Sequence, residues 1–213
     1  MSTYEYIRDP GEIYRRSAEL VATATDVSSV PAELHTLVYR LVHACGMPDI
    51  VEDLSWSGRP VQAGVQALTG GACIIADCEM VVDGIIRSRL PAANKVICTL
   101  NDPQVPDIQA LEQTTRSAAA VKLWSDHLAG AVVAIGNAPT ALFRLLDFVR
   151  GNAQAPRPAA LLAFPVGFVG AAESKAALIE AELDIPYVTL RGRRGGSAMA
   201  AAAVNALAGS LVS

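Results

Sequence analysis

His43 is the titratable residue of this sequence whose position most favours chemistry. It lies in the last turn of a predicted helix that begins near residues 29–31 and ends at Gly46. The apolar positions of this helix form one stripe, made of Leu34, Leu37, Val38, Leu41, Val42 and Cys45. At about 100° per residue, His43 points away from that stripe, beside Tyr39 and Arg40. The carbonyl end of a helix favours a cation, so His43 is either a proton donor that works near neutral pH or a solvated capping histidine.

Several arginines could hold an anionic ligand. Arg191, Arg193 and Arg194 cluster directly after a predicted strand and before a predicted helix, and Arg116 begins another helical segment. Guanidinium groups bind carboxylates and phosphates in bidentate fashion, so this set fits a small molecule with several anionic groups. Most surface arginines are simply solvated, and the residues alone do not identify the molecule.

Three glycine-containing loops follow predicted strands. They span residues 136–140, 165–170 and 191–197, and Asn137 lies in the first of them. Glycine permits close approach of a ligand to the backbone, and each loop leads into a helix N-terminus, whose free N–H groups suit anions. Glycine is also ordinary in strand-to-helix turns. Because parallel sheets bind ligands at the carboxyl ends of their strands, three such loops together favour a site there.

Motifs of several cofactor and catalytic classes are absent from the sequence. It contains no P-loop, no G-x-G-x-x-G after a predicted strand, no G-x-S-x-G and no H-E-x-x-H. Its four cysteines lack C-x-x-C spacing and only three histidines are present. We therefore expect free, buried thiols and no metal site.

Alternating strands and helices must position these residues. We expect strands at 72–77, 95–100, 131–135, 160–164 and 187–190, and helices at 140–149, 172–183 and about 197–207. The N-terminal third is typical of helices, with one starting at Asp9 and Pro10, a second ending at Gly46 and a third over about 60–68. The pattern predicts an α/β fold: a single domain over 1–213 in three layers, with a mostly parallel, doubly wound sheet and an α-helical N-terminal layer.

Composition narrows the class of protein further. The chain has 213 residues, 52% of them apolar, and a net charge of −4. This mildly acidic balance disfavours a nucleic-acid partner. The longest nearly apolar run, 158–172, is too short and too interrupted for a membrane span, and the N-terminus lacks the apolar core of a signal peptide. We expect a cytoplasmic protein with no membrane partner.

Taken together, these segments closely resemble the precorrin-8X methylmutase family of corrin-ring biosynthesis. The matching blocks occur in order and cover nearly the whole chain. They are 6–9 (YIRD), 13–17 (IYRRS), 42–46 (VHACG), 89–92 (RLPA), 115–119 (TRSAA), 134–142 (AIGNAPTAL), 165–170 (PVGFVG), 173–175 (ESK) and 191–199 (RGRRGGSAM). The residues 52–59 carry little resemblance.

The resemblance implies an α/β homodimer that binds a large tetrapyrrole near the subunit interface. It implies an isomerisation in which a methyl group moves from carbon 11 to carbon 12 of precorrin-8X by a 1,5-sigmatropic shift, giving hydrogenobyrinate. The family's catalytic histidine matches His43, with the proposed role of protonating the tetrapyrrole, and a substrate-site serine matches Ser17. Such a shift needs no metal, nucleotide or flavin cofactor.

The resemblance also gives the arginines a purpose, because the substrate carries many carboxylates. The expected substrate-binding residues are Ser17, Arg40, Arg116, Asn137, Arg191, Arg193 and Arg194. Of these, Arg40 and Asn137 are added on physical grounds, since Arg40 lies one turn from His43 and Asn137 lies at a strand end. Other readings are a corrinoid carrier without catalysis, cobalt-precorrin-8 as the natural substrate, and a sugar-phosphate isomerase on the same architecture.

Overall fold

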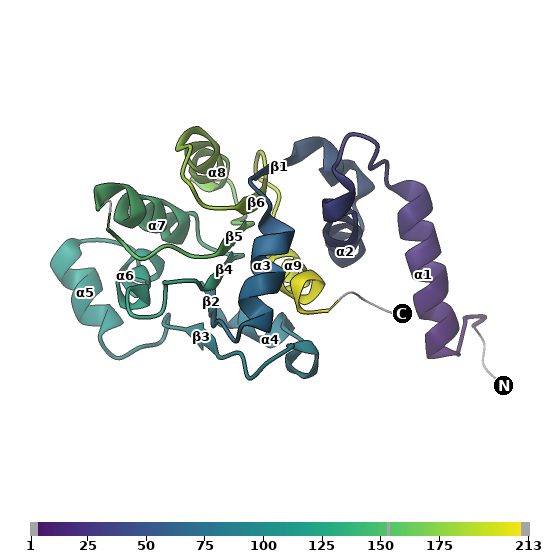
Figure 1. The fold of residues 1–213 in the computed structure, drawn as a ribbon, viewed down its shortest axis with the longest axis horizontal. Coiled ribbons are helices and arrows are strands. Elements are labelled where there is room, and N and C mark those ends of the chain that lie inside the picture. Colours follow the sequence, from purple (N-terminus) through teal and green to yellow (C-terminus); the bar gives the residue numbers. More distant parts are fainter. Residues whose placement is uncertain (1–3, 153, 210–213) are drawn as a thin grey trace.

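A six-stranded sheet forms the centre of the computed structural model, which describes residues 4–152 and 154–209 (Figure 1). Its order is β1-β6-β5-β4-β2-β3, and every neighbouring pair is parallel except β1 and β6. The strands are β1 (Leu54–Ser57), β2 (Ile74–Ala76), β3 (Val96–Cys98), β4 (Val132–Ile135), β5 (Ala160–Ala163) and β6 (Tyr187–Leu190). The mostly parallel sheet predicted from the sequence is confirmed.

Helices cover both faces of this sheet. On one face lie α5 (Val105–Glu112), α6 (Arg116–Val121), α7 (Pro139–Gly151) and α8 (Ala171–Glu180), and on the other α3 (Pro60–Thr69), α4 (Glu79–Gly84) and α9 (Ser197–Ala208) (Figure 1). Successive strand residues point to opposite faces. Ile74 and Ala76 accordingly pack into the core around α9, whereas Ile75 packs into the core around α7.

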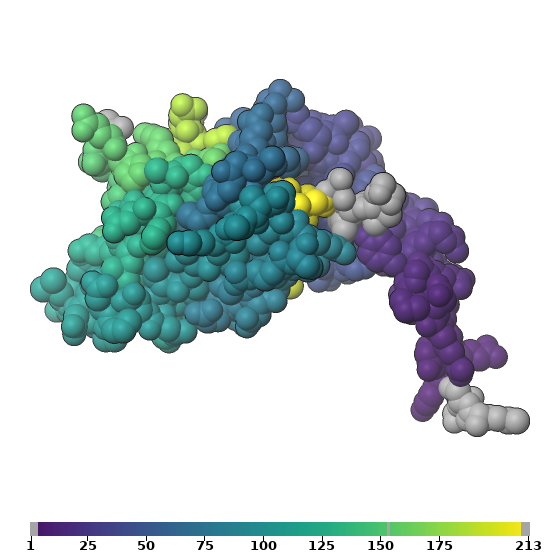
Figure 2. Space-filling model, turned by 60° about the horizontal axis from the view of Figure 1, so that its bottom comes forward, coloured from purple at the N-terminus to yellow at the C-terminus, as the bar shows by residue number. Residues whose placement is uncertain are grey.

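The N-terminal helices form a further layer outside α9. Helix α2 (His35–Cys45) packs on α9, and α1 (Pro10–Ala24) packs on α2. Asp9 caps α1 by accepting a hydrogen bond of 2.6 Å from the Glu12 backbone N–H, as its sequence predicts. No residue of α1 is buried, and Figure 2 shows this helix extending away from the body of the molecule. Val21 packs against the edge of the core, whereas Ile13, Tyr14 and Leu20 of this helix are exposed.

The edge strand β1 was not predicted from the sequence. Its four residues pair antiparallel with β6, from Leu54 opposite Leu190 to Ser57 opposite Tyr187. A short strand that contains two serines carries little hydrophobic signal of its own, and its pairing is set by the tertiary fold. The short helices α4 and α5 were likewise not predicted. Over the described residues, no helix is both long and apolar enough to cross a membrane.

Candidate active site

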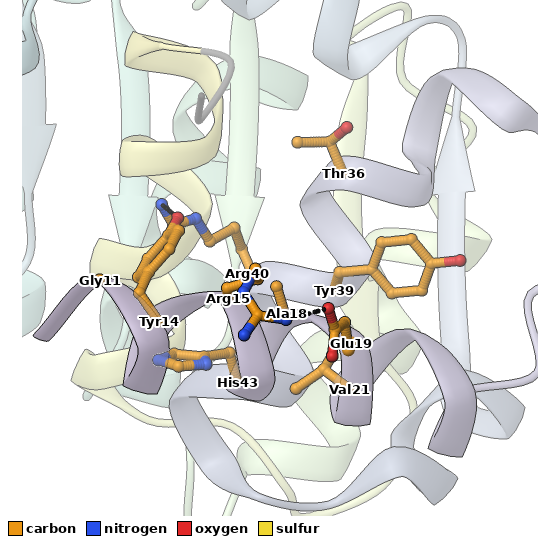
Figure 3. Close-up of a pocket in the computed structure, with 10 residues that line it drawn as sticks. All are labelled: Gly11, Tyr14, Arg15, Ala18, Glu19, Val21, Thr36, Tyr39, Arg40 and His43. Carbon is orange, nitrogen blue, oxygen red and sulfur yellow. Dashed lines mark hydrogen bonds and ion pairs between the residues drawn. The ribbon is translucent and has the colours of Figure 1, made fainter. Parts of the chain in front are cut away.

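A groove of about 620 Å³ lies between α1 and α2 (Figure 3). Its lining residues are Gly11, Tyr14, Arg15, Ala18, Glu19 and Val21 of α1, and Thr36, Tyr39, Arg40 and His43 of α2. The buried residues of α2 are Leu37, Val38, Leu41 and Val42, on the side away from the groove. The orientation that helical periodicity predicts for Tyr39, Arg40 and His43 is therefore confirmed.

His43 is held at the groove by a residue of the other helix. Its Nδ1 lies 3.1 Å from the Ser17 Oγ, within hydrogen-bond distance. Helix α2 ends two residues after His43, where Gly46 takes φ +70° and its N–H donates to the Val42 carbonyl. His43 therefore lies in the last turn, next to the negative end of the helix dipole. The two helices thus bring together the serine and the histidine that the family resemblance implied.

Arg40 lies one helical turn from His43, and its side chain has few hydrogen-bond partners among the described residues. Its Nη2 donates to the Tyr14 hydroxyl over 3.3 Å, and Figure 3 shows the tyrosine ring between the arginine and His43. Its Nε is buried and has no hydrogen-bond partner among the described residues. Burial lowers the pKa of the Arg40 guanidinium, and repulsion from Arg89 acts in the same direction. A desolvated cation without a carboxylate partner has capacity to bind an anion.

The carboxyl ends of the parallel strands form a second surface, here called the rim: Asp77 after β2, 136–140 after β4, 165–170 after β5 and 191–197 after β6. Asp77 is buried and accepts three backbone hydrogen bonds, of 2.8 Å from Gly136, 3.0 Å from Asn137 and 2.7 Å from Ala138. Burial raises the pKa of this carboxyl, and the three N–H donors act in the opposite direction. Asp77 thereby fixes the loop that carries Asn137, whose own side chain is half-buried.

The arginines after β6 point in different directions. Arg193 is exposed and stacks over the ring of Phe168, 5.2 Å from its centroid. Arg191 is exposed as well, and its Nη1 lies 3.4 Å from the Leu54 carbonyl. Arg194 instead forms ion pairs of 2.6 Å with each of two carboxylates, those of Asp49 and Asp53. Two terminal nitrogens of Arg194 are thus engaged within the chain, and its expected contact with the substrate stays a prediction.

Arg116 lies at the opposite end of the rim. It begins α6, where Thr115 caps the helix, and it donates from Nε to the Leu100 carbonyl over 3.0 Å and from Nη2 to the Asn101 side chain. Leu100 and Asn101 follow β3, which is four strands away from β6 in the sheet. At about 4.8 Å per strand, β3 and β6 are about 19 Å apart. The sequence-predicted arginines therefore bracket the rim and do not form one cluster.

The predicted residues thus occupy two surfaces of one chain. Arg40 and His43 line the groove and Ser17 contacts His43, whereas Asn137 and the other arginines lie on the rim. Three residues of interest were not singled out from the sequence: Tyr14, Asp77 and the buried Lys175. An acidic residue directly after a buried strand was the available signal for Asp77, and a charged residue within the apolar register of a helix was the signal for Lys175.

Among residues 4–152 and 154–209, no group of three or more His, Cys, Asp or Glu side chains could hold a metal ion. All four cysteines are free thiols, of which Cys78 is buried and the others are half-buried. Burial raises the pKa of Cys73 and Cys78, and that of Cys98 to about 12, so these thiols are poor nucleophiles.

Comparison with known proteins points to one family. A sequence model described as precorrin-8X methylmutase matches residues 12–210. A precorrin-8X methylmutase of Pseudomonas aeruginosa is 55% identical over 204 residues, which cover 96% of this chain and 97% of the relative. One of Sinorhizobium sp is 53% identical over 208 residues, covering 98% of each chain. Relatives named cobalt-precorrin-8 methylmutase are similar at 30–36% identity.

Solved structures agree with the sequence comparison. The precorrin-8x methyl mutase of Thermus thermophilus superposes with a TM-score of 0.83 at 34% identity, covering 92% of this chain and 94% of that one. The likeness therefore extends over most of both chains.

Proposed function

The chain belongs to the precorrin-8X methylmutase family, and on that premise we propose that His43, held by Ser17 in the groove between α1 and α2, is its proton donor. The enzyme is an isomerase of cobalamin biosynthesis that shifts a methyl group on the corrin ring system. The observation that carries the catalytic assignment is the 3.1 Å contact between Ser17 Oγ and His43 Nδ1. It fixes the imidazole ring and leaves Nε2 as the nitrogen available to the substrate.

The proposed reaction uses a proton to make the methyl migration easier. Nε2–H of His43 protonates the macrocycle, which places positive charge on its conjugated system. The methyl group then moves with its bonding electron pair from carbon 11 to carbon 12, and the ring returns a proton, so that substrate and product are isomers. Ser17 can accept from or donate to Nδ1, because a hydroxyl does both. It can therefore hold the imidazole ring before and after proton transfer.

Carboxylate recognition is assigned to arginines that have no acidic partner among the described residues. Arg40 contributes from the groove, and its buried, unpartnered Nε supports this role. Arg191 and Arg193 are exposed on the rim, and Arg116 lies at its far end, so together they suit a broad ligand with carboxylates on several sides. Asn137 is proposed as a neutral contact between them.

A homodimer is proposed because α1 offers an uncovered apolar surface. Ile13 and Leu20 of this helix are 47% and 60% exposed, and Tyr6, just before it, is 66% exposed. A second copy that packs here would cover these side chains and close the groove. Light scattering of purified protein should give twice the monomer mass. Leu20→Glu should weaken the dimer, whereas Leu111→Glu, at an exposed apolar residue of α5, should not; a monomeric wild type would contradict the proposal.

Metal-free precorrin-8X is proposed as the natural substrate over its cobalt-bearing counterpart. The support is that the relatives above 50% identity are named precorrin-8X methylmutases, whereas those named for cobalt-precorrin-8 lie at 36% or below. Comparison of kcat/KM for the two substrates tests this choice. A higher value for the cobalt compound would reverse it.

Turnover distinguishes an enzyme from a corrinoid carrier. Purified protein is incubated with precorrin-8X, and the visible spectrum is followed for conversion to hydrogenobyrinate. We expect catalytic conversion with many turnovers per protein. If the folded protein binds hydrogenobyrinate but converts no precorrin-8X, it is a carrier. The family's activity would then not apply to this chain.

A further inference from the structure

Lys175 of α8 is a fully buried cation outside the proposed catalytic groove. Its side chain is 0% exposed, and Nζ donates a hydrogen bond of 2.6 Å to the Arg194 backbone carbonyl. Burial lowers the pKa of Lys175 to about 8, whereas attraction by Asp53 acts in the opposite direction. Holding an ammonium group in this environment is costly, so its position calls for a specific role.

Arg194, whose carbonyl Lys175 contacts, also forms ion pairs with a third element of the fold. The Arg194 side chain pairs at 2.6 Å with both Asp49 and Asp53, which lie in the 3-10 helix Pro48–Asp53 directly after α2. These ion pairs raise the pKa of the Arg194 guanidinium. Arg194 therefore links the loop after β6 to the segment that follows the His43 helix.

The same loop is anchored by its backbone at further points. The Arg191 N–H donates to the Asp53 carbonyl over 2.7 Å, and the Gly196 N–H donates to the Phe164 carbonyl over 2.8 Å. At Gly195 a Cβ atom would lie 2.3 Å from the Phe164 carbonyl oxygen, so only glycine fits the approach of the two backbones. Between these anchors, Arg191 and Arg193 are left exposed.

We propose that Lys175, Arg194 and Asp53 form a latch that positions the loop 191–196 for substrate binding, so that Arg194 acts through Asp53 and does not touch the substrate. Lys175 holds the loop by donating a hydrogen bond to the backbone carbonyl of Arg194, and Asp53 holds it by an ion pair with the Arg194 guanidinium. Arg191 and Arg193 are thereby directed outward toward the carboxylates of the ligand. The proposal rests on the methylmutase function, because it assigns a role at the same substrate site.

A double-mutant cycle separates a latch from a direct contact. On an Asp49→Asn background, in which Asp49 cannot replace Asp53 as the partner of Arg194, the variants Arg194→Gln, Asp53→Asn and both together are compared for the KM and kcat of precorrin-8X turnover and for hydrogenobyrinate binding. A latch predicts that each single change raises KM about tenfold and leaves kcat within about twofold. It also predicts that the KM of the double variant is no higher than that of the single variant with the higher KM. If Arg194→Gln weakens binding while Asp53→Asn leaves it unchanged or tighter, Arg194 is a substrate contact and the proposal fails.

Variants of α8 test the other half of the latch. Lys175→Met should raise KM to a similar degree, and Lys175→Gln, which keeps an N–H donor, should restore part of the loss. Ser174→Ala is the matched control, since Ser174 is also buried in α8 but donates to Ala171 of its own helix. Equal KM values for Lys175→Met and the control would overturn the role of Lys175. If Lys175→Met does not fold, the cycle at Arg194 and Asp53 decides alone.

Limited proteolysis supplies a readout that does not need the substrate. Trypsin cleaves after arginine, and the loop contains Arg191 and Arg193 in addition to Arg194. Loss of the latch should accelerate cleavage after residues 191 and 193 about tenfold in Asp53→Asn and in Lys175→Met relative to Ser174→Ala. If the variants are cleaved faster but the wild-type protein neither binds nor converts a tetrapyrrole, the latch is supported and the proposed function is refuted. Unchanged cleavage together with normal wild-type turnover would refute the latch alone.

Discussion

Ser17→Ala tests whether the serine acts on catalysis through the imidazole ring. The change removes Oγ, which lies 3.1 Å from His43 Nδ1, and leaves the α1 backbone with a good helix former. Ser17 is half-buried and His43 is exposed, so the hydrogen bond competes with water and its net contribution is about 0.5–1.5 kcal/mol. If that energy orients the ring in the transition state, kcat falls about two- to twelvefold.

The assay is steady-state conversion of precorrin-8X, followed by absorbance, with kcat and KM determined separately. Ser17→Thr keeps a hydroxyl and should retain more of the rate, and Thr23→Ala is a control on the same helix, where the Thr23 hydroxyl donates to the Glu19 carbonyl. We expect the Ser17→Ala loss mainly in kcat. An unchanged kcat with a raised KM would mean that Ser17 binds substrate without orienting His43, and the reasoning from the 3.1 Å contact would be refuted.

Three further predictions concern the rim and α8. In Asp77 the two carboxylate oxygens accept hydrogen bonds from three N–H groups, and Asp77→Asn leaves one carbonyl oxygen to accept them. Urea denaturation should therefore show that the free energy of unfolding falls by about 2–4 kcal/mol. A fall of less than about 1 kcal/mol would contradict this. Gly195→Ala places a Cβ against the Phe164 carbonyl and should lower Tm and raise KM, whereas Gly151→Ala, with open space around its Cβ, should do neither; equal behaviour of the two would contradict the contact. Lys175 has its pKa lowered in the fold to about 8 from 10.5, so its buried charge opposes folding below pH 8 and this cost is relieved as pH rises toward 10.5. The stability of wild type relative to Lys175→Met should therefore increase between pH 8 and pH 10 in denaturant titrations, and a decrease would show that pairing outweighs burial.

The spacing of apolar residues was enough to predict the strands of the parallel sheet and the longer helices. Buried parallel strands are nearly continuous in apolar residues, so their positions are written locally in the sequence. The direction of His43 was also local information, because it follows from the stripe of apolar residues on its own helix. The edge strand β1 could not be predicted in this way, since its register is fixed by β6, more than a hundred residues later.

Partners of side chains were the part that the sequence could not supply. Ser17 and His43 are 26 positions apart and meet only because α1 packs along α2. Arg194 resembles Arg193 in the sequence, yet its partners Asp49 and Asp53 lie 145 and 141 positions earlier. A cluster of arginines predicts an anionic ligand in general, whereas the fold decides which arginine is already neutralised by its own chain.

His43→Ala, measured in a single-turnover reaction with precorrin-8X, tests the central claim most directly. Circular dichroism and hydrogenobyrinate binding serve as controls for folding and for the substrate site. General acid catalysis contributes about 10²–10⁴-fold, so we predict that the methyl shift slows by at least about a hundredfold while product binding changes little. Turnover close to that of wild type in the folded variant would contradict the assignment of His43 as the proton donor.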